Sequence, residues 1–197
     1  MEIILATKNA GKVREMAEIM APYNISVISQ KDAGIDVEVL ETGSTFEENA
    51  EIKARAVAML CDLPVIADDS GLCIDALGGK PGIYSARYGG EELPYTEKIR
   101  CLLKELEDVT DRSARFECAM VLVMPDGHKF SATGAVAGSI LQAPEGTGGF
   151  GYDSIFYSSE LGKSFGVASD EEKNSISHRG RALKKLCDEL TDKGVLE

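Results

Sequence analysis

A short apolar run that ends in two carboxylates is the feature that most constrains this chain. Residues 64–67 (Pro-Val-Ile-Ala) have the length and composition of a buried strand, and Asp68, Asp69 and Ser70 follow directly. Ligands of α/β folds bind where strands end, so polar residues there indicate a site. Two carboxylates favour a metal ion, and a turn that they cap together with Ser70 and Gly71 is the alternative.

Composition and charge exclude several classes of protein. The 197 residues are 44% hydrophobic, enough for a sizeable core, and the net charge of −12 comes without a long Lys/Arg run. We therefore expect no binding to nucleic acid or to a membrane surface. The five cysteines have no CxxC spacing, and no stretch approaches the ~20 apolar residues of a membrane span. We expect a soluble protein of the reducing cytoplasm.

Strand-like runs alternate with helical patterns along the chain. A buried-type strand over 3–6 is followed by a helical pattern over 13–20, and Ser44–Glu47 has the pattern of a capping box that opens a helix. Two β-rich runs, 115–124 and 128–136, flank a Pro-Asp-Gly turn and predict a hairpin. These elements predict an α/β protein with a mixed sheet.

Two further segments complete the sequence pattern. After the strand at 64–67 we expect a glycine-rich functional loop over 71–90. The spacing of the leucines predicts a last helix over 183–190.

Residues 6–12 (Ala-Thr-Lys-Asn-Ala-Gly-Lys) join the first strand to the first helix. Free backbone N–H groups and the helix dipole favour an anion at such a position. The segment differs from a Walker A loop because Ala6 replaces its first glycine and Val13 stands where a Mg²⁺-binding Ser or Thr is required. A loop that only caps the helix is the alternative to phosphate binding.

A third polar group lies near the C-terminal end. Residues 146–153 (Gly-Thr-Gly-Gly-Phe-Gly-Tyr-Asp) allow a flat ligand to approach the backbone and to stack on Phe150 or Tyr152. Lys173 and Arg179 carry charges that suit a phosphate or an oxo group. An ordinary loop, with His178 as a capping or surface residue, is the alternative.

Six stretches together resemble the inosine triphosphate pyrophosphatase family, also called RdgB/HAM1-like. They occur in order over nearly the whole chain, and the joint occurrence of the last two is highly specific. The stretches are ATKNAGK at 6–12, ETGSTFEENAEIKA at 41–54, IADDSG at 66–71, LGGKPGIYSARY at 77–88, GTGGFGYD at 146–153 and EEKNSISHRGRAL at 171–183.

The resemblance implies both a fold and an activity. The fold is an elongated α/β protein with a central mixed sheet and flanking helices, a single domain over 1–197 whose two lobes enclose a nucleotide cleft, and the expected assembly is a homodimer. The activity is Mg²⁺-dependent hydrolysis of deaminated purine nucleoside triphosphates (ITP, dITP, XTP) to the monophosphate and pyrophosphate.

The resemblance also assigns roles around the metal. Asp69 holds the metal and acts as general base on the attacking water, Asp68 supports the ion, and Ser70 contacts the substrate. Glu41 is the expected second metal ligand. Many relatives have two acidic residues at this point and this chain has one, so Glu38 is the fallback ligand.

The remaining roles concern the substrate. A metal with Lys or Arg donors neutralises the charge that develops on phosphate oxygens. Arg179 can only donate hydrogen bonds, which suits a 6-oxo group and opposes the amino group of adenine. The expected triphosphate-binding residues are Thr7, Lys8, Asn9, Ala10, Gly11, Lys12, Lys53 and Lys173. The expected base-binding residues are Phe150, Gly151, Tyr152, Asp153, His178 and Arg179.

Two other classes remain as alternatives. A non-catalytic nucleotide-binding regulator would bind the same ligand without turnover, and a kinase or GTPase-like switch would transfer or release orthophosphate. Mg²⁺-dependent pyrophosphate release distinguishes the expected enzyme from both.

Overall fold

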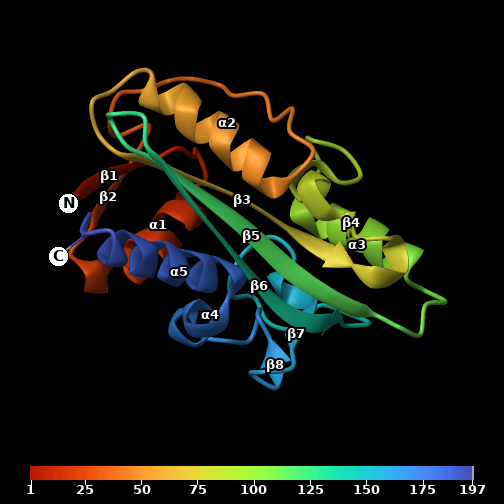
Figure 1. Cartoon of the computed structure of the whole chain (residues 1–197). Coiled ribbons are helices and arrows are strands. Elements are labelled where there is room, and N and C mark those ends of the chain that lie inside the picture. Colours follow the sequence, from red (N-terminus) through yellow and green to blue (C-terminus); the bar gives the residue numbers. More distant parts are fainter. Residues whose placement is uncertain (197) are drawn as a thin grey trace. The chain divides into compact units, whose positions relative to one another are not determined.

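A mixed β-sheet is the main feature of the computed structural model, which describes residues 1–196 (Figure 1). Its strand order is β2-β1-β3-β5-β6-β7-β8, and β4 pairs with β3. The strands are β1 (Glu2–Leu5), β2 (Ser26–Ser29), β3 (Val65–Ile74), β4 (Lys80–Pro81), β5 (Ser113–Val123), β6 (Lys129–Ile140), β7 (Phe156–Ser158) and β8 (Lys163–Ser164). The helices are α1 (Ala10–Met20), α2 (Phe46–Ala58), α3 (Tyr95–Glu105), α4 (Asp170–Ile176) and α5 (His178–Asp192).

Parallel and antiparallel pairings occur in the same sheet. β1 pairs in parallel with β2 on one side and with β3 on the other, whereas β4 is antiparallel to β3 and β7 is antiparallel to β6 and β8. The predicted α/β class with a mixed sheet and flanking helices is confirmed. The chain order reverses at β1, and α/β proteins bind ligands at the carboxyl ends of the strands beside such a reversal.

The chain forms two compact units. Unit 1 contains residues 1–69 and 118–134 and the chain from 179 on, and unit 2 contains residues 70–117 and 135–178. The single domain with two lobes that we expected from the sequence stays a prediction.

Unit 1 has an apolar core on each face of its part of the sheet. Figure 1 shows α1 and α5 on one side of the strands and α2 on the other. Met16 of α1 and Leu186 of α5 pack with Ile66 of β3 on the first side. On the second side, Ala54 of α2 packs with Ala67 of β3. Each face of β3 in unit 1 is therefore buried under a helix.

Unit 2 is built around aromatic side chains. Phe116 of β5, Phe156 of β7 and Phe165 lie with ring centroids 4.7 to 6.1 Å apart, and Leu102 of α3 belongs to the same core. Residues of this core come from β3, β5, β6 and the loops between β6 and α4.

The start of α2 differs by one residue from the predicted capping box. Thr45 is the N-cap, and its Oγ1 accepts from the backbone N–H of Glu48 at 3.1 Å. The Glu48 carboxylate accepts from the backbone N–H of Ser44 at 2.7 Å. Thr45 therefore caps the helix in place of Ser44, and Glu48 binds the residue before the cap, so the reciprocal pair of a capping box is incomplete.

The strand predicted over 64–67 is longer than its apolar run, and the loop expected over 71–90 is wrong. β3 continues through both aspartates to Ile74, because Leu72 and Ile74 are buried in the core of unit 2. The 3₁₀ turns Asp75–Leu77 and Gly82–Arg87, with β4 between them, occupy most of the remaining segment. The hairpin predicted between β5 and β6 is confirmed, with Gly127 N–H donating to Met124 O at 2.9 Å.

No helix in the described part of the chain, residues 1–196, is long and apolar enough to cross a membrane.

Candidate active site

Asp68 and Asp69 point to opposite faces of the sheet. Both lie inside β3, and successive side chains of a strand alternate between its two faces. Ile66, two residues before Asp68, packs on the side of α1 and α5, whereas Ala67, two residues before Asp69, packs on the side of α2. The adjacent carboxylates therefore belong to separate groups of side chains.

The first group, the Asp68 cluster, consists of Asp68, Lys12, Glu15 and Arg179. Arg179 Nε and Nη2 donate to Asp68 Oδ2 at 3.2 and 2.9 Å, Lys12 Nζ lies 3.0 Å from the same oxygen, and Arg179 Nη1 donates to Glu15. Burial alone would raise the pKa of Asp68, but the charges of Lys12, Arg179 and Lys53 outweigh it and hold the pKa well below its usual range. Asp68 is therefore an ionised counter-charge for the two cations.

The second group, the Asp69 cluster, consists of Asp69, Asn49, Lys53 and Glu41. Asn49 Nδ2 donates to Asp69 Oδ2 at 3.1 Å, and Lys53 Nζ lies 2.6 Å from Glu41 Oε1 and 3.6 Å from Asp69 Oδ1. Burial raises the pKa of Asp69; Lys53 opposes this increase and Glu41 adds to it. A carboxylate with a raised pKa accepts a proton more readily, as a general base must.

Helix α2 positions the Asp69 cluster. Asn49 and Lys53 are four residues apart, so their side chains lie on one face of the helix. Asn49 Oδ1 also accepts from the backbone N–H of Gly43 at 2.8 Å, and a Cβ at Gly43 would stand 2.7 Å from that oxygen. The close approach requires glycine and fixes the segment that carries Glu41 two residues earlier.

The loop before α1 caps its helix. Asn9 Oδ1 accepts from the backbone N–H groups of Gly11 and Lys12 at 2.9 and 3.2 Å, and Thr7 Oγ1 accepts from Asn9 N–H at 3.2 Å. Lys8 extends away to Asp36, at 3.0 Å. Ala10 and Gly11 are the first residues of α1. The loop thus performs the capping role weighed above, and its phosphate-binding role stays a prediction.

A third group, the Asp153 cluster, lies within unit 2 and consists of Asp153, Lys173 and Phe150. Asp153 Oδ2 accepts from Lys173 Nζ at 2.9 Å and from the backbone N–H of Phe150 at 2.8 Å, and Lys173 Nζ lies 4.8 Å from the centre of the Phe150 ring. Gly149 has a φ of 67°, and a Cβ there would lie 2.1 Å from the Asp153 carboxylate. Glycine at 149 lets this carboxylate hold the loop.

Two predicted base-binding side chains are core residues. Tyr152 is 2% exposed, and its hydroxyl donates to the backbone oxygen of Ser85 at 2.9 Å, so its ring is not available for stacking. Phe150, which is half-buried, therefore remains as the aromatic candidate of this loop. His178 is buried and stacks on Phe116, with ring centroids 4.8 Å apart. Ser70 lies in β3 and Gly151 has a φ of 66°, and the substrate-binding roles of both stay predictions.

Arg179 differs most from its expected role. Its side chain is 1% exposed, and its guanidinium is bound to Asp68 and Glu15. Burial alone would lower the pKa of Arg179, but the two carboxylates raise it. The arginine expected to recognise the base is thus an internal partner of the Asp68 cluster in this structure.

The donor set fits a magnesium ion bound by two carboxylates. Within residues 1–196, no group of three or more His, Cys, Asp or Glu side chains is arranged to hold a metal. Mg²⁺ is commonly bound by only one or two carboxylates together with water and substrate phosphates. Glu41 and Asp69 share the ammonium group of Lys53, which marks a position that favours positive charge. Asp68 is engaged by Arg179 and Lys12 on the other face, so its predicted role at the metal has no support in these contacts.

Glu15 and Asn49 belong to these clusters but were not predicted from the sequence. Glu15 is three residues after Lys12 and Asn49 is four before Lys53, so helical spacing places each near the predicted lysine. This helical spacing was the sequence signal that could have identified Glu15 and Asn49. Glu38, the fallback metal ligand, has a 92% exposed side chain 3.6 Å from Lys8, whereas Glu41 is the glutamate that reaches Lys53.

The fold and the clusters define an α/β protein with buried cation–carboxylate clusters, two of which are centred on the adjacent aspartates of β3. A model of the Ham1 family matches residues 3–189. The chain belongs to the Ham1 family. This confirms the family resemblance and the prediction that the chain is a hydrolytic enzyme.

Relatives match over nearly their full length. A protein of Shigella flexneri is 49% identical over 96% of this chain and 98% of its own, and one of Bacillus licheniformis is 50% identical over 94% and 95%; both carry the name dITP/XTP pyrophosphatase. The solved structure of the Staphylococcus aureus Ham1 protein has a TM-score of 0.87 and 42% identity, and the match covers 98% of this chain and 100% of that one.

Proposed function

We propose that the protein is a Mg²⁺-dependent pyrophosphatase that hydrolyses dITP, ITP and XTP to the monophosphate and pyrophosphate, and so removes deaminated purine nucleotides from the precursor pool. The names of the Shigella and Bacillus relatives support a dITP/XTP substrate. The observation that carries the proposal is the difference between the two adjacent aspartates: Asp68 is bound by Arg179 and Lys12, whereas Asp69 is held by Asn49 and lies 3.6 Å from Lys53.

In the proposed reaction a water oxygen adds to the α-phosphorus of the substrate. The bond from that phosphorus to the bridging oxygen breaks, pyrophosphate leaves, and Asp69 accepts the proton of the water. Asn49 orients Asp69 by donating to its Oδ2. The other oxygen, Oδ1, is then on the side of Lys53, whose Nζ lies 3.6 Å away. Asp69 is therefore the proton acceptor for this hydrolysis.

Cations of this chain neutralise the triphosphate. Lys53 and Lys12 are held by carboxylates of the two clusters, so they keep their positions without substrate. Glu41 and Asp69 would hold Mg²⁺, which when bound neutralises charge on the phosphate oxygens and lowers the pKa of water. Such preorganised charge stabilises the transition state of phosphoryl transfer.

The Asp153 cluster is proposed to bind the base. Phe150 offers a ring for stacking, and Lys173, fixed by Asp153, can donate to an oxo group of hypoxanthine or xanthine. A base-reading role for Arg179 would require its guanidinium to leave Asp68 and Glu15, so we assign it instead to positioning Asp68. A homodimer in the cytoplasm is part of the proposal, and sedimentation tests the assembly.

The test is a panel of nucleoside triphosphates assayed separately for pyrophosphate and orthophosphate, with and without Mg²⁺. We expect pyrophosphate release from ITP, dITP and XTP at least a hundred times more efficient than from ATP, and only with Mg²⁺. Orthophosphate as product would indicate a GTPase-like enzyme. Tight binding without turnover would indicate a regulator.

A further inference from the structure

Ser85 is the centre of a hydrogen-bonded link within unit 2. Its hydroxyl accepts from the backbone N–H of Leu72 in β3 at 2.9 Å and donates to the backbone oxygen of Gly82 at 2.7 Å. The backbone oxygen of Ser85 accepts from the hydroxyl of Tyr152 at 2.9 Å. Ser85 is 6% exposed, so these bonds are shielded from water. One buried residue therefore contacts both β3 and the loop over 149–153.

Glycine at position 71 allows the close approach of this link to β3. A Cβ at Gly71 would stand 2.2 Å from the backbone oxygen of Gly82 and 2.6 Å from the hydroxyl oxygen of Ser85. These distances leave no space for a side chain, so the 3₁₀ turn that carries Ser85 lies directly on the strand. Because Ser70 immediately precedes Gly71, this contact is next to a predicted substrate-binding residue.

Helix α3 supports the same link. Tyr95 packs edge-on against Tyr152, with ring centroids 5.4 Å apart and an angle of 87° between the rings. Lys98, three residues later and 3% exposed, donates to the backbone oxygens of Ala86 and Glu91. One helix therefore holds both the ring that donates to the link and the chain that directly follows Ser85.

The link reaches the middle of the Asp153 cluster. Tyr152 is two residues after Phe150 and directly before Asp153, whose carboxylate accepts from Phe150 N–H at 2.8 Å and from Lys173 at 2.9 Å. These internal bonds keep the cluster together. The bond from Tyr152 to Ser85 attaches it to β3, so a shift of Ser85 would move the proposed base-binding groups as a set.

We propose that Ser85 is a positioning residue for the nucleobase, which holds the loop over 149–153 at the place on β3 where Phe150 and Lys173 bind the base. The inference rests on the proposed function, in which the Asp153 cluster binds the base. Binding groups act well only when they are held within about 0.5 Å of the productive geometry. Loss of the link should therefore weaken binding of the base and leave the chemical step nearly unchanged.

Two variants break the link at different bonds. Ser85→Ala removes the hydroxyl but keeps the backbone oxygen, and Tyr152→Phe removes the donor to that oxygen but keeps the ring. With ITP and Mg²⁺, we expect each variant to raise KM at least fivefold and to change kcat less than twofold. Because both bonds belong to one link, the double variant should raise KM no more than twofold beyond the stronger single variant.

Binding without turnover gives a second readout. The ligands are an ITP analogue with a CH₂ group in place of the oxygen between the α- and β-phosphorus, and inorganic triphosphate, which has no base. In calorimetric titrations with Mg²⁺, both variants should bind the analogue at least fivefold more weakly than the parent does. Their affinity for inorganic triphosphate should stay within a factor of two of the parental value, because the link concerns the base.

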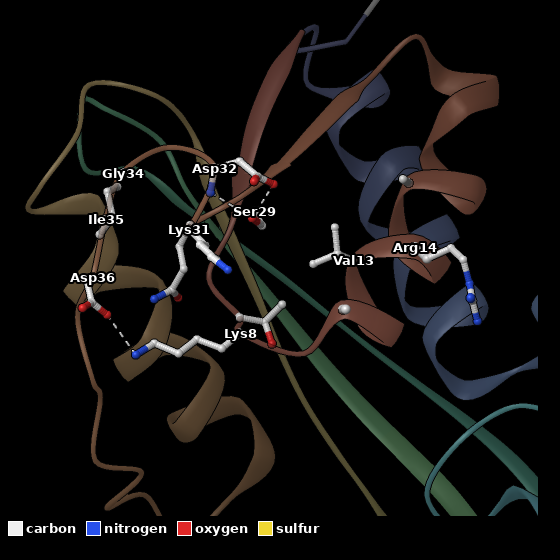
Figure 2. A pocket seen from close by; sticks show the side chains of 13 residues that line it. Lys8, Val13, Arg14, Ser29, Lys31, Asp32, Gly34, Ile35 and Asp36 are labelled. Atoms are coloured by element: carbon white, nitrogen blue, oxygen red, sulfur yellow. Dashed lines mark hydrogen bonds and ion pairs between the residues drawn. The ribbon is translucent and has the colours of Figure 1, made fainter.

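Ser29→Ala is the matched control. Ser29 is 8% exposed, and its hydroxyl accepts from the backbone N–H of Asp32 at 3.0 Å and donates to the Asp32 carboxylate at 2.6 Å. Figure 2 shows this pair at a pocket of unit 1. The control removes a buried serine hydroxyl with the same pattern of bonds outside unit 2. It should leave KM and both affinities within a factor of two, and urea unfolding measures the stability of every variant.

Phe150→Ala distinguishes failure of this inference from failure of the proposed function. Weaker binding of the analogue by Phe150→Ala, with parental binding by Ser85→Ala and Tyr152→Phe, would overturn the positioning role alone. Parental binding by Phe150→Ala would overturn the base-binding role of the loop, and the positioning role with it. Equal weakening of the analogue and inorganic triphosphate, or an equal effect of Ser29→Ala, would indicate a general loss of structure and would also overturn the inference.

Discussion

Arg179 donates two hydrogen bonds to a single carboxylate oxygen of Asp68, 111 residues away in the chain. The Nη1 group of the same guanidinium donates to Glu15, so one arginine joins the start of α5 to β3 and α1. Both partners of the pair are buried, with side chains 1% and 0% exposed. The Arg179–Asp68 pair therefore contributes both to the stability of unit 1 and to the charge distribution around Asp68.

Arg179→Ala is expected to destabilise the protein, because it leaves Asp68 buried without its main partner. Breaking a buried ion pair costs about 3–5 kcal/mol. Urea unfolding measures this change. Arg179→Lys retains the charge without the forked geometry, and we expect it to recover part of the loss.

The same variants separate positioning from base recognition. If Arg179 acts through Asp68, the catalytic efficiencies for ITP and ATP fall in proportion, and their ratio is preserved. A large fall for ITP alone, with the ATP rate unchanged, would assign Arg179 to the 6-oxo group instead.

Asp69→Asn is expected to abolish turnover and to leave the fold intact. The amide keeps an oxygen that can accept from Asn49 Nδ2, but it is neither a base nor an anionic metal ligand. The measurements are pyrophosphate release and thermal unfolding of the purified variant. Asp108→Asn, at an exposed position, is the matched control and should keep parental activity. Substantial turnover by Asp69→Asn would exclude the assignment.

Lys12→Ala is expected to reduce stability as well as activity. A solvated lysine contributes little to folding, but this side chain is 16% exposed and paired with a buried carboxylate. We expect a loss of about 1–3 kcal/mol in urea unfolding, together with a large fall in kcat/KM. Lys8→Ala, with a side chain 50% exposed, should change stability by no more than about 0.5 kcal/mol. Equal stability effects of the two variants would contradict the assignment.

The sequence predicted the local elements better than the contacts between them. Apolar periodicity identified α1 and α5, the capping pattern at Ser44–Glu47 identified the start of α2, and the Pro-Asp-Gly turn identified the hairpin of β5 and β6. The length of β3 was not predicted because two aspartates interrupt its apolar run. Both aspartates are accommodated in the strand because side chains distant in the sequence pair with them, Arg179 with Asp68 and Asn49 with Asp69.

Separation along the chain also explains what was missed in the clusters. Arg179 and Asp68 are 111 residues apart. No local sequence pattern indicates that Arg179, predicted to bind the base, will instead pair with a residue so distant in the chain. Lys53 and Glu41 were both predicted to be at the site, because each lies in a stretch that resembles the family. The structure adds that the side chains of Lys53 and Glu41 are in direct contact.

Glu41→Gln and Glu38→Gln separate the two candidate metal ligands. Glu41 lies 2.6 Å from Lys53, which also approaches Asp69, whereas Glu38 is exposed beside Lys8. If Glu41 and Asp69 hold Mg²⁺, Glu41→Gln should raise the Mg²⁺ concentration for half-maximal activity at least tenfold, because the neutral amide is a weaker ligand. Glu38→Gln should leave that concentration within a factor of two. Calorimetric titration of Mg²⁺ into both variants gives a readout independent of turnover. A shift for Glu38→Gln with none for Glu41→Gln would transfer the metal role to Glu38.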